Sequence, residues 1–343
     1  MKLGILKEFT GLEQPYVDAC RELGIEYEVI DIIASDWMQR IKDSDCDGYL
    51  VRSSYAKDTW KRMYDEKVYY INVVMGKPVY PPFNDIFIHE SKNNMAYWLE
   101  AHDIPQAGSW VFYRSDEAAE FIETKAKFPL IFKPTVGSYA LGVKIINNQR
   151  EAKKLIKQVF TKYGFFNRGF TKYKRSKIGL PVPVMDDRQF NHLMFQERID
   201  IKYEWRMVKV DQSYFGHQKL KKGDFHSGSG MVGWVDPPEV LLELIRYICD
   251  IGNFNALNVD VFEDQQGNYF VNELQPFWGA VDTSQMYVDG KPGRYFFRNG
   301  GWFFEEGVFC QNACCNLKVQ AFINQLEEAH LLTIPLETLD VVS

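Results

Sequence analysis

The alternation of short apolar runs with amphipathic segments over residues 1–88 constrains the fold of this chain most strongly. The apolar runs KLGILK, YEVIDI and DGYLV are separated by helix-like segments at YVDACRELG and DWMQRIK. This β-α-β-α-β order predicts a parallel sheet with helices on both faces. Such sheets bind ligands beyond the carboxyl ends of their strands, where Lys7, Glu8 and Arg52 follow here. These three are candidate substrate contacts, with surface exposure or a structural salt bridge as the alternative.

Residues 89–343 carry a mixed pattern of strands and helices. After a helix within 89–107, strands are expected at SWVFY, FPLIFKP and KIINN, with helices at SDEAAEFIETKAK and QREAKKLIKQVFTKYG. The runs HLMFQERI, YEWRMVKV and SYFGHQKL indicate consecutive strands, followed by a helix at PEVLLELIRYICDIG, a strand hairpin over 258–275 and a cysteine-bearing C-terminal helix. For 343 residues we therefore predict an α/β protein with α+β portions, divided into units 1–88, 89–195 and 196–343.

Residues 162–190 stand apart because they are basic, aromatic and proline-containing and show no clean period. Long irregular segments inside a compact domain are usually either covers of a functional site or disordered connections. We predict a basic flap here that closes over a bound ligand. A plain surface loop is the alternative.

Composition excludes some functions for the chain as a whole. The net charge is −6 and the pI is about 5.6, so neither a nucleic-acid partner nor a membrane surface is indicated. The N-terminal apolar run is too short for a signal peptide and no run of 18 apolar residues occurs, so a cytoplasmic location is expected. The six cysteines fit no zinc-binding spacing and are expected to be free thiols.

The segment NVDVFEDQQGNYFVNELQ places two acids and an amide on a predicted hairpin. Asp260 lies in the first strand, EDQQGN forms the turn, and Glu273 and Gln275 share one face of the returning strand. Carboxylate and amide oxygens on neighbouring strands are ligands that suit magnesium with bound phosphates. The alternative is a pair of solvated acids near a turn.

A glycine-bearing loop follows a buried strand that ends in a lysine. Lys133 closes PLIFK, and Gly137 and Gly142 in the next loop allow the backbone to approach a ligand closely. Backbone amides in such a loop can hold an anion, and the lysine adds a positive charge. The loop matches neither a P-loop nor a dinucleotide-binding fingerprint, and a tight hairpin loop is the alternative.

Taken in order along the chain, these features resemble the ATP-grasp ligases, the superfamily of D-alanine–D-alanine ligase, glutathione synthetase and ribosomal-protein glutamate ligases. The resemblance covers roughly residues 85–280, and residues 1–85 match the small Rossmann-like domain that precedes the grasp. It implies two α+β subdomains that clasp ATP between them. No single motif carries it, but order and spacing agree throughout.

The resemblance also implies a nucleotide site. Lys92 and Lys133 match the two phosphate-binding lysines, and Glu204 matches the acid that binds the ribose hydroxyls. The loop that covers the phosphates corresponds to Gly137, Ser138 and Gly142. The hinge that contacts adenine corresponds to Glu197, Arg198 and Ile199, with Gln196 directly before it.

Asp260, Glu273 and Gln275 match the magnesium ligands of the family. Gln275 departs from the usual asparagine and is one methylene longer, which puts in doubt how tightly a second metal is held. Arg206 matches the basic residue of the family's acid-x-Arg strand. Lys219 and Arg294 are further candidates for catalysis, and Lys221 and Arg298 carry the same weaker expectation. Lys219 and Lys221 follow the next predicted strand, whereas Arg294 and Arg298 are expected in the loop GKPGRYFFRNGG after the metal strand, which in related enzymes faces the acceptor substrate. Solvated surface positions are the alternative for all four.

The resemblance implies an ATP- and Mg²⁺-dependent ligase, with Mn²⁺ as a possible substitute, that joins a carboxylate to an amine through an acylphosphate. The implied partners are small molecules such as an amino acid or an amino-sugar precursor, and a homodimer stays open. Two alternatives are a phosphotransferase of the same fold, which releases a phosphorylated product, and a non-catalytic nucleotide-binding protein.

Overall fold

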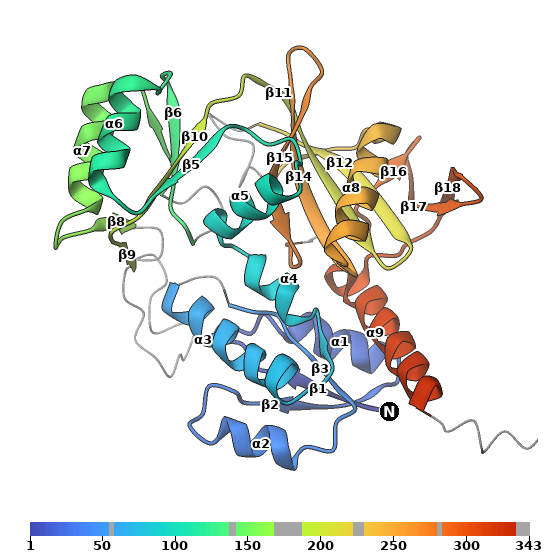
Figure 1. Cartoon of the computed structure of the whole chain (residues 1–343). Helices are drawn as coiled ribbons and strands as arrows, with labels where there is room; N and C mark the ends of the chain where they lie inside the picture. The colour runs from blue at the N-terminus through green and yellow to red at the C-terminus, as the bar shows by residue number, and fades with distance from the viewer. Residues whose placement is uncertain (55–57, 137–141, 168–186, 222–229, 280–282, 334–343) are drawn as a thin grey trace, which may run out of the picture.

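A computed structural model of the chain describes residues 1–54, 58–136, 142–167, 187–221, 230–279 and 283–333. Figure 1 shows a small parallel sheet with its helices at the N-terminus in blue, a green unit of sheet and helices, and a large yellow-to-orange sheet. The long C-terminal helix, in red, leaves the large sheet and runs beside the N-terminal unit. The predicted mixture of parallel α/β and α+β portions is confirmed.

The N-terminal unit is the parallel sheet expected from the alternating pattern, with strand order β2-β1-β3-β4. Its strands are β1 (Lys2–Leu6), β2 (Glu26–Ile30), β3 (Gly48–Leu50) and β4 (Val79–Tyr80). Its helices are α1 (Gln14–Glu22), α2 (Trp37–Asp43) and α3 (Asp58–Tyr69), which runs into a π-helical turn, η1 (Tyr70–Val74). Because β1 and β3 lie at the centre of the sheet, their carboxyl ends place Glu8 and Arg52 at the same edge.

Two short helices, α4 (Phe83–Ile88) and α5 (Lys92–Ala101), lead into the second unit. That unit is an antiparallel sheet of order β5-β10-β6-β7. Its strands are β5 (Ser109–Phe112), β6 (Leu130–Lys133), β7 (Lys144–Ile146) and β10 (Leu193–Glu197), covered by α6 (Ser115–Thr124) and α7 (Gln149–Val159). Helix α7 buries Ala152, Leu155, Ile156 and Val159, the spacing of an apolar helix face.

The basic segment 162–190 was predicted to be one long loop, and the structure corrects its two ends. Strand β8 (Phe165–Asn167) pairs antiparallel with β9 (Asp187–Gln189), so the segment begins and ends in a small two-stranded ladder. Residues 168–186, which include most of the predicted flap, lie outside the described residues.

The third unit is a large, mainly antiparallel sheet. Its central path is β15-β14-β11-β12-β17-β16, with β13 beside β12 and β18 beside β17. The strands are β11 (Ile201–Val210), β12 (Ser213–Lys219), β13 (Val232–Gly233), β14 (Ala256–Asp264), β15 (Tyr269–Gln275), β16 (Tyr287–Val288), β17 (Lys291–Arg298) and β18 (Gly301–Glu306). One face packs on α8 (Glu239–Gly252) and α5 through Trp205, Met207, Val259 and Val261. On the other face, Val208, Val210 and Phe215 belong to a core shared with the N-terminal unit, so polar side chains can occupy only the remainder of that face.

Helix α9 (Gln311–Thr333) joins the large sheet to the N-terminal unit. Its residues Cys314, Val319 and Phe322 share one core with Leu3 and Tyr16 of the N-terminal unit and with further residues of the large sheet. The first turn of α9 is kinked, with left-handed backbone at 312–314. All six cysteines are free and buried. None of the described helices is long and apolar enough to span a membrane.

Candidate active site

The inner face of the large sheet brings three charged side chains into one row. In the strand register, Arg206 of β11 lies opposite Asp260 of β14, and Asp260 lies opposite Glu273 of β15. Side chains directly opposite each other on adjacent strands point to the same face of a sheet. Asp260 and Glu273 therefore lie side by side, as the predicted hairpin required.

Asp260 is a buried carboxylate with an almost complete set of donors. Arg206 donates to it through Nε at 3.1 Å and Nη2 at 3.3 Å, Lys219 Nζ lies at 2.9 Å, and Asn258 Nδ2 lies at 3.3 Å. Burial alone raises the pKa of this carboxyl, but the Arg206 and Lys219 charges outweigh that effect and hold the pKa well below its usual range. Asp260 is thus ionised, and Arg206 and Lys219 balance its charge.

Glu273 is the more open of the two acids, with 21% of its side chain exposed. Its Oε1 lies 3.3 Å from Lys92 Nζ, and Lys92 also pairs with the buried Glu90 at 3.0 Å. Burial raises the pKa of Glu273, but the charges of Lys92, Lys133 and Lys219 together outweigh that effect, so the pKa falls below its ordinary value. Burial raises the pKa of Glu90 to about 7. Lys92 therefore lies between two acids, and its positive charge favours the ionised form of Glu273.

Two amide oxygens complete a hard-oxygen set beside these acids. Asn258 and Gln275 lie opposite each other on β14 and β15, two residues along the strands from Asp260 and Glu273. Asn258 Oδ1 and Gln275 Oε1 are buried and have no hydrogen-bond partner among the described residues. A buried amide oxygen without a donor is costly unless a ligand satisfies it. Carboxylates with unsatisfied amide oxygens are the donor set that Mg²⁺ prefers, so the residues present fit this metal.

Lys133 reaches the same face from the second unit. It ends β6, is 8% exposed, and donates from Nζ to Asn272 Oδ1 at 2.7 Å. It forms no ion pair with a described residue, although Glu273 acts on it through space. Burial lowers the pKa of Lys133 to about 8. A buried cation without an ion-pair partner suits a binding site for an anion such as a phosphate.

Glu204 and Lys219 form the end of the row that lies toward the second unit. They are opposite each other in the register of β11 and β12, and Lys219 bonds both Glu204 and Asp260. The chain reaches β11 from β10 through Arg198 and Ile199, and Glu197 N donates to Gly108 O at 2.7 Å. Gln196 is buried and bonds Ser109 Oγ at 3.0 Å, whereas Glu197 is exposed. The predicted hinge thus connects the two sheets directly.

The other predicted residues divide into three groups. Gly137 and Ser138 lie outside the described residues, and Gly142 has a left-handed backbone with φ +79°. Lys7 is exposed, and Glu8 is buried with Oε2 bonded to its own loop at Thr10 and Leu12. Lys221 and Arg298 are exposed.

The expected placement of Arg294 in a loop is wrong, and its role in catalysis stays a prediction. It was expected in a loop facing the substrate, but it lies within β17 and pairs with Glu305 of β18 at 2.7 Å. It also donates to Ser213 Oγ at 2.9 Å. Ser213 is six residues before Lys219 on β12, roughly 20 Å along a strand. Arg294 therefore does not join the row of charged side chains.

Sequence reasoning missed several residues at this site. Asn258 could have been found, because it precedes Asp260 by two positions and so shares its strand face. Asn272 sits at a register shift in β15, which no local pattern indicates. Glu90, the second partner of Lys92, has a left-handed backbone with φ +51° between α4 and α5 and carries no motif.

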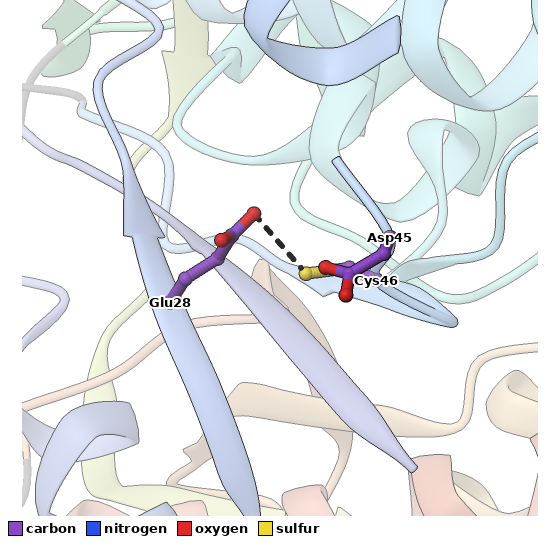
Figure 2. A group of neighbouring side chains, drawn as sticks. All are labelled: Glu28, Asp45 and Cys46. Atoms are coloured by element: carbon purple, nitrogen blue, oxygen red, sulfur yellow. Dashed lines mark hydrogen bonds between the residues drawn. The ribbon is translucent and has the colours of Figure 1, made fainter. Parts of the chain in front are cut away.

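A second group of potential ligands lies in the N-terminal unit. Figure 2 shows Glu28, Asp45 and Cys46 close together, with the Cys46 thiol bonded to Glu28 Oε1 at 3.5 Å. Lys2 already pairs with both acids, and its Nζ lies 3.0 Å from Glu28 Oε2. Burial raises the pKa of Cys46 to about 11, so the thiol stays protonated. The ammonium group of Lys2 thus occupies the position that a metal ion would take between Glu28 and Asp45.

Comparison with solved structures identifies the fold of this chain. No protein-family model matches the sequence, and no curated protein matches it either. Among solved structures, D-cycloserine synthetase DcsG is 15% identical, with a TM-score of 0.55 over 95% of this chain and 100% of that one. D-alanine–D-alanine ligase from Bacillus anthracis complexed with ATP is 13% identical, with a TM-score of 0.54 over 96% and 99%. A RimK domain ATP-grasp protein from Sphaerobacter thermophilus DSM 20745 is 14% identical, with a TM-score of 0.51 over 80% and 90%.

These similarities show the fold. The chain has the ATP-grasp fold, in which an antiparallel sheet with two helices faces a larger sheet, and a small parallel-sheet unit precedes both. The resemblance inferred from the sequence is confirmed at this level. With identities of 13–15% among these three neighbours, the reaction has to be argued from the site itself.

Proposed function

We propose that this protein is an ATP- and magnesium-dependent ligase that joins a carboxylate to an amine and releases ADP and phosphate. One observation carries the proposal: on a fold shared with ligases, Asp260 and Glu273 lie side by side with Lys92, Lys133, Lys219 and Arg206 around them. This is a compact, partly buried array of alternating charge. Such an array can stabilise the negative charge of a phosphoryl group while that group moves from ATP to an acceptor.

The nucleotide is bound by residues of both sheets. Lys133 supplies a cation without an ion-pair partner among the described residues from β6. Lys92, which pairs with Glu90 and Glu273, supplies a second positive charge from the start of α5. Glu204 offers carboxylate oxygens to the ribose, and the hinge at Glu197–Ile199 contacts the base, as the resemblance implies. These groups hold the phosphates above Asp260 and Glu273.

Asp260, Glu273 and Gln275, with Asn258 beside them, would hold the metal. When bound there, Mg²⁺ offsets the negative charge that develops on the phosphates. Asp260 already accepts from Arg206, Lys219 and Asn258, so these donors must share it with the ion. Glu273 has more free lone pairs and is the more accessible ligand.

The chain's own contribution to the reaction is electrostatic. Arg206 is fixed by Asp260, and the resemblance implies that it supplies a positive charge near the phosphates or the acylphosphate. Lys92 and Lys133 stabilise the negative charge of the phosphoryl group that is transferred. Positioned charges suffice for this chemistry, and no protein nucleophile is required.

One experiment tests the proposed function. The purified protein is incubated with Mg²⁺-ATP and pools of carboxylic acids, with and without amines, and ADP and phosphate are measured. A ligase releases both only when an acid and an amine are present together, and a coupled product appears by mass spectrometry. A phosphorylated acceptor without amine dependence would instead identify a phosphotransferase. Failure to bind or turn over ATP under any condition would leave a non-catalytic protein.

Gln275→Asn is expected to retain turnover within about threefold of the wild type and can increase it. The amide oxygen is kept and only one methylene is lost, and magnesium tolerates water as a further ligand. Steady-state ADP release as a function of Mg²⁺ concentration measures the effect. Gln275→Leu, which removes the oxygen but keeps the size, is the matched control and should require a higher Mg²⁺ concentration. Equal behaviour of the two variants would remove Gln275 from the metal site.

Metal and nucleotide are expected to bind cooperatively. In the free protein Lys219 and Arg206 saturate Asp260, whereas nucleotide phosphates would draw Lys219 away and free a carboxylate oxygen. We expect Mn²⁺ to bind at least about tenfold more tightly with a non-hydrolysable ATP analogue than without it, the usual size of such coupling. Titration by electron paramagnetic resonance measures free Mn²⁺ directly. Lys219→Met should raise metal affinity in the absence of nucleotide, and unchanged affinity would contradict the shielding of Asp260.

A further inference from the structure

The buried lysine and arginine side chains indicate a second binding site beside the proposed nucleotide site. Among the described residues, the buried lysine and arginine side chains are Arg52, Lys61, Lys92, Lys133 and Lys318. Lys61 pairs with Asp65 at 2.7 Å and Lys92 pairs with Glu90 at 3.0 Å. Arg52 and Lys318, like Lys133, form no ion pair with a described residue. A buried charge without a counterion destabilises the folded state. Two such positive charges close together therefore indicate a site for an anionic ligand.

Arg52 and Lys318 meet at one place although they come from opposite ends of the chain. Arg52 follows β3 and donates from Nη2 to Trp278 O at 2.9 Å. Lys318 of α9 donates to Pro276 O at 2.9 Å, and its Nζ lies 3.8 Å from the centre of the Trp278 ring. Both cations thus hold the loop that directly follows Gln275 of the metal site.

Nearby acids do not neutralise this pair. Asp85 of α4 acts on Lys318 through space, beyond ion-pair distance, and burial raises the pKa of its carboxyl well above the ordinary range. Burial thus favours the uncharged form of Asp85. Burial also lowers the pKa of Lys318 to about 8, as expected for a lysine whose counterion is missing.

Unused hydrogen-bond donors collect at the same end of the parallel sheet. Arg52 Nε and the hydroxyls of Ser53 and Ser54 are buried and have no partner among the described residues. The Tyr16 hydroxyl is in the same state and lies within electrostatic reach of Arg52. Buried donors are almost always satisfied in native proteins, so this concentration points to an acceptor-rich ligand. The carboxyl ends of parallel strands are where ligands bind in such sheets.

We propose that Arg52 and Lys318, with Ser53 and Ser54, form an anion subsite that anchors a carboxylate of the substrate which does not itself react. This inference rests on the proposed function, because it places the subsite next to the ligase centre. Arg52 Nε, the remaining Lys318 N–H groups and two serine hydroxyls are enough to satisfy the roughly four lone-pair positions of a carboxylate. The reacting group of the same molecule lies toward Asp260 and Glu273.

The distance between the two sites defines the class of substrate. Trp278 is three positions after Gln275, and three residues span at most about 11 Å. One small molecule can therefore bridge the subsite and the metal site. An amino acid, a short peptide or a dicarboxylic acid has the required carboxylate. A neutral amino sugar lacks it and is excluded as the anchored substrate.

The test uses the full chain loaded with Mg²⁺ and a non-hydrolysable ATP analogue. The probes are the common amino acids and small dicarboxylic acids, each compared with the corresponding amide, and inorganic phosphate. Thermal shift detects binding, because a ligand of the folded state raises the melting temperature, and calorimetry gives affinities. We expect at least one carboxylate to bind at least tenfold more tightly than its amide. A response to phosphate but to no carboxylate would overturn the carboxylate assignment.

Variants separate an anion subsite from a structural brace. Arg52→Gln and Lys318→Met should each weaken the carboxylate probe at least tenfold while the shift caused by Mg²⁺-nucleotide persists. Arg52→Lys keeps the positive charge and should retain part of the affinity for the carboxylate. It also provides a test if Arg52→Gln fails to fold. Arg40→Gln, an exposed arginine on α2 paired with Asp36, is the control and should change nothing.

Two outcomes have different meanings. If Mg²⁺-nucleotide stabilises the protein but carboxylates and amides bind equally, or neither binds, the subsite is wrong and the two cations only hold the 276–278 carbonyls. If Mg²⁺-nucleotide itself does not bind, the proposed function fails first. The nucleotide measurement in the same experiment thus keeps the two failures apart.

Discussion

Asp260→Asn is expected to reduce magnesium-dependent turnover by at least about 10²-fold, the size of effect seen when one preorganised electrostatic group is lost. The substitution removes a charged metal ligand and leaves Arg206 and Lys219 without their shared counterion. Breaking a buried ion pair from one side costs about 3–5 kcal/mol of folding free energy. We therefore expect a lower melting temperature together with the loss of turnover.

Glu273→Gln separates these two effects. Its side chain is partly exposed and Lys92 keeps Glu90 as a partner, so we expect a similar loss of turnover with a much smaller loss of stability. Turnover is measured by ADP release over a range of Mg²⁺ concentrations, and stability by thermal unfolding. Asp36→Asn on the surface of the N-terminal unit is the control. Wild-type turnover in Glu273→Gln would show that the metal site is misassigned.

Local periodicity predicted the parts of the fold that local interactions determine. The parallel strands β1 to β3 and the hairpin of β14 and β15 follow from apolar runs and turn residues that are close in sequence. The position of β10 between β5 and β6 could not be predicted in this way, because the pairing joins segments separated by more than sixty residues. Such a pairing depends on tertiary packing and leaves no period in the sequence.

The site was predictable to the extent that the sheet register is local. Asp260 and Glu273 were brought together by the turn between them, and Glu204 and Arg206 share a face because they are two positions apart. Arg294 was misplaced because YFFR was taken for a loop, although its aromatic residues suit a strand. Lys318 could not be found, because its bond to Pro276 joins α9 to a loop 42 residues earlier.

Lys133→Met is expected to abolish nucleotide binding and at the same time to stabilise the protein without ligand. Burial lowers the pKa of Lys133 to about 8, so keeping it charged in the folded state costs free energy. One pKa unit corresponds to about 1.4 kcal/mol, and losing the bond to Asn272 returns part of the gain. A net stabilisation of about 1–2 kcal/mol is expected, since Met keeps most of the side-chain volume.

The pH dependence of this difference has a definite sign. The pKa of Lys133 is lower in the folded state than in the unfolded state, so the unfolded state binds more protons. The destabilisation by the wild-type lysine is therefore full below about pH 8 and disappears as the pH rises toward the ordinary lysine pKa of about 10.4. Thermal unfolding of both proteins from pH 7 to 10, with and without Mg²⁺-ATP analogue, measures both effects. Lys153→Met, at an exposed lysine paired with Glu123, is the control. A destabilised Lys133→Met that still binds nucleotide normally would mean that Lys133 supports the fold rather than binds phosphate.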